Sequence, residues 1–177
     1  MTNLTSTRLA TIISRSFDFD KGGKTRMHRV IRNFVTKDFV ESIIDEHDER
    51  GTQLLDLENA AVAVLLLPMA DSAVDARGLR EVSSQLRTLD SSHGKSPISR
   101  LLDAAREGRD AKMVVTAYWL AGTGQIQRTV RIEIDGESLT GDAAQIMADY
   151  KKSMPEPRAT LEIPTTQLLS TLLAAVE

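Results

Sequence analysis

The chain of 177 residues contains no cysteine. That absence excludes disulfide bonds, catalysis by a thiolate, and zinc or iron–sulfur sites with cysteine ligands. It also fits a reducing compartment, because disulfides persist where the environment is oxidising. The N-terminal segment lacks the charged start and long apolar run of a secretory signal. We therefore expect a cytoplasmic protein, or one of the host cytoplasm or virion if its source is viral.

Long apolar runs are missing as well. The longest, residues 60–67, is far shorter than the ~20 residues that a membrane-spanning helix needs. A hydrophobic content of 41% and a charged content of 27% are typical of a folded globular protein. The pI near 5.7 argues against a protein that coats nucleic acid over its whole surface, but it allows a local basic patch.

No catalytic or cofactor motif is complete. Residues 23–25, Gly-Lys-Thr, resemble the end of a phosphate-binding loop, but Asp18 occupies the position that needs the first glycine of that loop. His47 lies in the acidic run 45–49, yet consecutive residues of a helix point in different directions and do not converge on a metal ion. We expect a non-enzymatic protein with no catalytic residue, no metal site and no cofactor.

Charge, in contrast, is strongly segregated. Residues 21–37 carry six basic residues and no acidic one, whereas residues 38–58 carry eight acidic residues and one basic residue, Arg50. The local net charge therefore changes from +6 to −7, although the whole chain sums to −3. A segregated field of this kind can dock an anion, a nucleic acid or a second copy of the chain.

Two candidate sites follow from this pattern, and the alternative for both is a solvated surface with no partner. The expected polyanion site comprises Lys21, Lys24, Arg26, His28, Arg29, Arg32 and Lys37. The expected acidic surface for a partner comprises Asp45, Glu46, Asp48 and Glu49.

The backbone of this segment has two interpretations. Apolar residues at three- and four-residue steps from Met27 to Ile44 favour one helix over residues 24–48. That helix would carry its charges against its own dipole, so it would need an anion at one end and a basic surface at the other. The alternative is two helices that meet at residues 33–36, with Thr36 capping the second, and it weakens the polyanion interpretation.

The overall pattern predicts an α+β fold with a helical N-terminal half, residues 1–95. Further helices are expected within residues 4–16, at 53–67 and at 77–89, and Pro68 is expected to end or kink the second. Residues 90–97 are polar and form the best candidate linker, with Ser96 capping the helix that follows.

The C-terminal half, residues 96–177, switches to a β-β-α-β-α order after that first helix. The hairpin 112–134 alternates apolar and polar residues, and Arg128 is the single break in its inward row. A helix at 140–152, a strand at 159–163 and a final apolar helix complete the pattern. The final helix must be buried, on its own sheet or on a second copy. The two halves form either two regions or one compact domain.

Tyr118 and Trp119 are adjacent in the expected hairpin, so one of them faces the core and the other is exposed. An exposed aromatic ring beside Arg128 or Arg131 is suited to stacking a base, although a core or interface role is the commoner one.

We expect the protein to be a small oligomeric binding or assembly factor, associated with RNA or DNA or accessory to a virus or mobile element. Its partners would be itself, a nucleic acid or another protein, and no membrane. The alternatives are an adaptor or inhibitor that binds only proteins, and an enzyme that acts on a phosphorylated ligand near Lys24 and His28.

Overall fold

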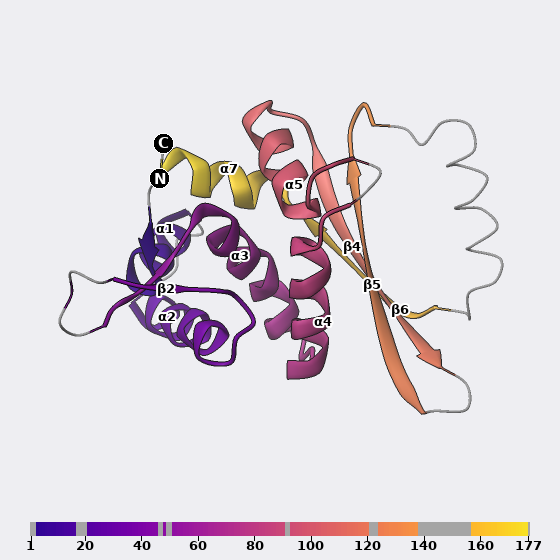
Figure 1. The fold of residues 1–177 in the computed structure, drawn as a ribbon, viewed down its shortest axis with the longest axis horizontal. Coiled ribbons are helices and arrows are strands. Elements are labelled where there is room, and N and C mark those ends of the chain that lie inside the picture. The colour runs from indigo at the N-terminus through magenta and orange to yellow at the C-terminus, as the bar shows by residue number, and fades with distance from the viewer. Residues whose placement is uncertain are drawn as a thin grey trace.

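The computed structural model describes residues 3–16, 21–45, 48, 51–90, 93–120, 124–137 and 157–176. These residues form helices and two small antiparallel sheets, so the expected α+β class is confirmed (Figure 1). The expected helix at 140–152 lies outside the described residues, as do the side chains of Ser16 and Lys21. No helix in the described part of the chain has both the length and the hydrophobicity needed to cross a membrane.

The helices are α1 (Ser6–Ser16), α2 (Lys21–Thr36), α3 (Leu57–Asp71), α4 (Ala76–Arg87), α5 (Pro97–Arg106) and α7 (Thr166–Ala174). The strands are β1 (Leu4–Thr5), β2 (Ile43–Ile44), β3 (Gln53–Leu55), β4 (Ala111–Leu120), β5 (Gln125–Ile134) and β6 (Pro157–Pro164). One sheet has the strand order β1-β3-β2 and the other has the order β5-β4-β6.

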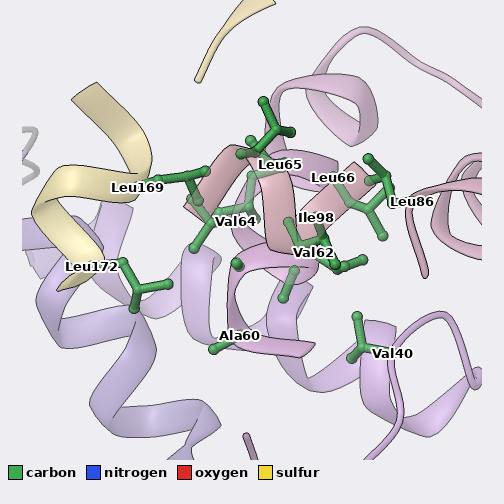
Figure 2. Packing of buried hydrophobic residues seen from close by; sticks show 14 of the residues in the cluster. Val40, Ala60, Val62, Val64, Leu65, Leu66, Leu86, Ile98, Leu169 and Leu172 are labelled. Atoms are coloured by element: carbon green, nitrogen blue, oxygen red, sulfur yellow. The ribbon is translucent and has the colours of Figure 1, made fainter. Parts of the chain in front are cut away.

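Helix α3 is the centre of the molecule. Its sequence is apolar on all sides, and all residues from Asn59 to Leu67 are buried. It contacts α2, α4, α5, α7 and β3, and Figure 2 shows its side chains meeting Leu86 of α4, Ile98 of α5 and Leu169 of α7. A helix without a polar face is stable only when other elements surround it, which is the arrangement seen here.

Helix α3 starts and ends at identifiable residues. Asp56 caps its N-terminus, where its side chain accepts a hydrogen bond of 2.8 Å from the backbone of Asn59. The helix does not end at Pro68 but continues to Asp71, and the Pro68 carbonyl still accepts a bond of 3.0 Å from Ser72 N. Proline loses only its own N–H donor, and the surrounding core holds the last turn in place.

The second sheet packs one face on α4 and α5. The strand bounds agree with the expected hairpin, and the alternation places Met113, Val115, Ile132 and Ile134 on the helix side. Helix α7 is buried as expected, but it packs on α1, α3 and α5 instead of the sheet. One hydrophobic cluster therefore contains residues from both sides of position 95.

The outer edge of β5 is closed by α4. The side-chain amide of Gln85 donates a bond of 2.8 Å to Arg128 O, and its oxygen accepts a bond of 2.9 Å from Val130 N. Arg128 itself lies on the helix side, within 3.3 Å of Asp75 and 3.5 Å of Glu81. The single polar residue in the inward row is thus paired by two carboxylates of the α4 segment.

Helix α2 ends at Thr36, so the single helix expected over residues 24–48 is wrong. Asp38 adopts a left-handed conformation with φ of 56° and donates its N–H to Val35 O at 3.1 Å. Phe39 N donates to Phe34 O at 2.8 Å, and the two phenylalanine rings lie 5.9 Å apart. These bonds and this contact are the Schellman motif, which ends a helix and turns the chain away.

The two-helix alternative is wrong as well, because residues 37–45, which the structure describes, contain no helix. Residues 43–44 instead form β2, which pairs antiparallel with β3. The three- and four-residue spacing of apolar residues was therefore produced by a helix, a tight turn and a strand in succession.

Candidate polyanion-binding surface

Helices α1 and α2 pack against each other and bury an apolar seam that includes Leu9, Ile13, Ile31 and Phe34. Their remaining faces are basic, because the two helices together contain seven basic residues and no acidic one. Those residues are Arg8 and Arg15 in α1, with Lys21, Lys24, Arg26, Arg29 and Arg32 in α2. We call these two helices the basic helix pair. The site expected from the sequence begins at residue 21, so it does not include the two arginines of α1.

The expected polyanion residues are distributed unequally over this surface. Lys24, Arg29 and Arg32 are exposed, as is Lys37 just beyond the helix end. Arg29 and Arg32 form no ion pair within the described part of the chain, whereas Arg26 forms one of 2.6 Å with Asp71. Both members of that pair are largely exposed, so it contributes little to stability and leaves Arg26 accessible.

His28 has a structural partner. Its Nε2 lies 3.1 Å from Thr7 Oγ1 of α1, and the residue is half-buried. Lys24, His28 and Arg32 are four residues apart, so they lie in one row along α2. Because His28 contacts α1, this row runs along the junction between the two helices. The middle of the exposed face lies instead at Arg29 and its helical neighbour Arg26.

The electrostatics of α2 are unfavourable at its N-terminal end. Its first turn has no acidic residue and includes basic ones, opposite to what the helix dipole favours, at a cost of about 0.3–1 kcal/mol per exposed charge. Asp45 and Asp48 do not lie at its C-terminal end, because the helix stops at Thr36; Asp38 is the acidic residue in the turn that ends it. The helix dipole therefore favours an added anion at the N-terminal end of α2.

The expected acidic surface is partly described. Asp45 and Asp48 lie in the connection between β2 and β3, where Asp45 N donates to Thr52 O at 2.9 Å and Asp48 accepts a hydrogen bond from the Thr52 hydroxyl. Glu46 and Glu49 lie outside the described residues.

Strand β2 presents two large apolar side chains to solvent. Ile43 is 54% exposed and Ile44 is 66% exposed. The apolar spacing predicts both residues within one helix, and their place in β2 shows that this expectation is wrong. Exposed isoleucines on a short outer strand are a feature of interaction surfaces.

Trp119 is the exposed member of the aromatic pair, at 42%, while Tyr118 is half-buried on the opposite face of the sheet. Trp119 pairs across the strands with Ile126, which is 40% exposed. The neighbouring cation is Arg158 of β6, whose guanidinium carbon lies 4.9 Å from the ring centroid. The expected neighbours, Arg128 and Arg131, form ion pairs elsewhere.

The position of Trp119 explains its exposure. Alternation in β4 places it on the helix side of the sheet, but the last residues of β4 and the first of β5 project past the N-terminal end of α4 (Figure 1). Sequence periodicity identifies the face of the sheet on which a residue lies. It does not indicate how much of that face a helix covers.

Within the ranges that the structure describes, no three histidine or carboxylate side chains are grouped as metal ligands. Comparison with known proteins found no family model that matches this chain and no curated relative.

Proposed function

We propose that this chain is a non-enzymatic, polyanion-binding protein and that the basic helix pair is its docking surface. The observation that carries the proposal is the presence of seven basic residues and no acidic one on two helices that pack together. The chain as a whole has a net charge of −3, so this concentration of positive charge is local.

The side-chain types support phosphate as the docked group. Five of the seven basic residues are arginines, whose planar guanidinium groups bind phosphate oxygens in pairs. Each basic residue that contacts a nucleic acid also releases condensed counterions, so the affinity falls steeply as salt rises. Arg29 and Arg32 are exposed and have no competing carboxylate among the described residues.

The test is a salt series with a fluorescently labelled oligonucleotide. For the variant Lys24→Ala/Arg29→Ala/Arg32→Ala we expect weaker binding and a salt slope lower by about 2, at about 0.7 per lost contact with a single strand. The matched control is Arg106→Ala/Lys112→Ala/Arg131→Ala, which removes the same charge from α5 and the sheet. Equal slopes for the two triple variants would refute the docking surface.

Self-association through β2 is a second candidate function. Ile43 and Ile44 are exposed on an outer strand, and Asp45 beside them carries the opposite charge to the basic helix pair. We expect light scattering to show an oligomer at low salt, and Ile43→Ser/Ile44→Ser to reduce it to a monomer. A wild-type protein that is monomeric at every salt concentration would exclude this function.

A further inference from the structure

We propose that the polyanion is a single-stranded nucleic acid, which runs from the basic helix pair across α4 to Trp119. This inference rests on the proposed function and specifies its ligand. It is carried by a row of contacts that connects the two ends of the path.

The first contacts join the end of α2 to α4. Arg80 of α4 donates a hydrogen bond of 3.3 Å to Lys37 O, and its guanidinium lies 5.5 Å from the centroid of the Phe39 ring. Ser83, one turn further along α4, donates a hydrogen bond to Phe39 O. The Arg80 guanidinium is therefore held beside the backbone at the end of α2, and Arg80 and Lys37, both exposed, continue the basic surface from α2 onto α4.

The next contacts join α4 to the hairpin. Arg77 lies three residues before Arg80 and so occupies the neighbouring position on the same helix face. Its Nη2 donates a hydrogen bond of 3.2 Å to Gln125 Oε1, at the start of β5. Gln125 precedes Ile126, which pairs directly with Trp119. Figure 1 shows α2, the start of α4, the end of β4 and the start of β5 along the lower side of the view.

The middle of this path is an exposed face of α4. Arg77, Arg80, Glu81, Ser84 and Gln85 line a shallow, open face of α4 there. Glu81 is the acidic residue within it, and its carboxylate lies 2.8 Å from Arg77 and 3.5 Å from Arg128. Arg77, Arg80 and Arg128 together outnumber the carboxylates of Asp75 and Glu81, so this face of α4 does not repel a phosphate chain.

The aromatic end of the path selects the class of polyanion. Bases of a single strand stack on exposed aromatic rings, whereas a duplex keeps its bases paired and polyphosphate has none. Arg158 now covers the Trp119 ring, and a base that stacks there displaces its guanidinium. The freed guanidinium can then bind the adjacent phosphate, so the ring and the cation recognise successive parts of one nucleotide.

Trp119 is the only tryptophan of the chain, so its fluorescence reports on this contact alone. Wild-type protein is titrated with oligo-dT, oligo-rU, a duplex of equal length and inorganic polyphosphate. We expect fluorescence quenching with one or both single strands and little change with the duplex or polyphosphate. Comparison of the quenching by oligo-dT with that by oligo-rU distinguishes DNA from RNA as the ligand. Equal quenching by polyphosphate would overturn the inference.

Variants distinguish the contribution of the aromatic end of the path from that of the basic face of α4. With a labelled single strand, Trp119→Ala should weaken binding roughly tenfold without changing the salt slope, and Trp119→Phe should restore most of the affinity. Arg77→Ala/Arg80→Ala should instead lower the slope by about 1.4. Tyr118→Ala, on the opposite face, serves as the control and should bind as wild type does.

The outcomes also distinguish this inference from the proposed function. If Trp119→Ala binds as well as wild type while the variants of the basic helix pair bind weakly, the single-strand path is wrong and the docking surface stands. If no polyanion binds to the wild-type protein, both are wrong.

Discussion

The guanidinium of Arg128 occupies the space beside Gly78 that any other residue would fill with its Cβ. An ideal Cβ at position 78 would lie 2.6 Å from Arg128 Nε and 2.7 Å from Nη1, closer than real contacts allow. Gly78 lies in the first turn of α4, between the two carboxylates that pair with Arg128. The helix therefore gives up a residue of higher helix propensity so that β5 can pack on it.

A double-mutant cycle tests this relationship. Alanine stabilises a helix by about 0.5–1 kcal/mol relative to glycine, so Gly78→Ala should stabilise the variant Arg128→Ala by about that amount. In the wild-type background the same change should destabilise the protein, because it displaces a guanidinium that is only 11% exposed. Chemical denaturation measures both values, and equal changes in the two backgrounds would contradict the steric explanation.

Gln85 closes the edge of β5, and its two hydrogen bonds require both a donor and an acceptor. Gln85→Glu keeps the acceptor for Val130 N but loses the donor to Arg128 O. We expect it to lower the free energy of unfolding by about 1–3 kcal/mol, since a strand carbonyl is left without its partner. A second variant, Gln85→Ala, removes both hydrogen bonds and leaves the outer edge of β5 unpaired. We expect this protein to aggregate faster than wild type on heating. Thioflavin binding and denaturation curves measure these effects, and Ser84→Ala is the neighbouring control.

Three helices end with the same backbone motif and different residues. The left-handed position is Asp38 after α2, Ala73 after α3 and Gly108 after α5, with φ of 56°, 58° and 68°. A left-handed conformation costs a residue with a side chain about 1–2 kcal/mol. We therefore expect Ala73→Gly to stabilise the protein by about 1 kcal/mol and Gly108→Ala to destabilise it similarly. Thermal melts provide the measurement, and a change of the same sign in both variants would refute the assignment.

Glu137 links stability to pH. Burial opposes its ionisation, but hydrogen bonds from Arg100 and Arg109 outweigh that effect and hold the pKa of Glu137 below its usual value of 4.5. The ionised carboxylate therefore stabilises the folded state above about pH 4.5, and this contribution is lost as the pH falls through the lowered pKa. Glu137→Gln should be less stable than wild type at pH 7 and should lose less stability on acidification below pH 4.5.

Urea denaturation at pH 7 and at several values below 4.5 measures this difference. Glu107→Gln is the matched control, because Glu107 contacts one of the same arginines and its side chain is 58% exposed. A wild-type protein and a Glu137→Gln variant with parallel pH profiles would show that the ion pairs are not linked to folding.

Much of the sheet and of its preceding helices follows from the sequence. The clean alternation in residues 125–134 predicts a strand with the same bounds, and Ser96 before Pro97 predicts the helix start that the structure shows. These signals are local and strong, because alternation and capping involve residues within one element.

The segment after α2 was not predictable in the same way. Its turn depends on Asp38, and a left-handed aspartate lacks the glycine that usually marks a helix end. Phe34 and Phe39 stay in contact through that turn, so the apolar spacing continues while the helix does not. The contacts from Lys37 to Trp119 join the turn after α2, helix α4 and strands β5 and β4. These residues are far apart in the sequence, so no local spacing of residues predicts the contacts.

The central position of α3 has a consequence for synthesis. The helix is complete at Asp71, but α7, which covers one of its sides, ends only at Ala174. At about 5–20 residues per second, roughly 5–20 s separate the two on the ribosome. During that interval the side of α3 that faces α7 is an apolar surface open to chaperones and to other nascent chains, so the helical body cannot be finished before the sheet has been made.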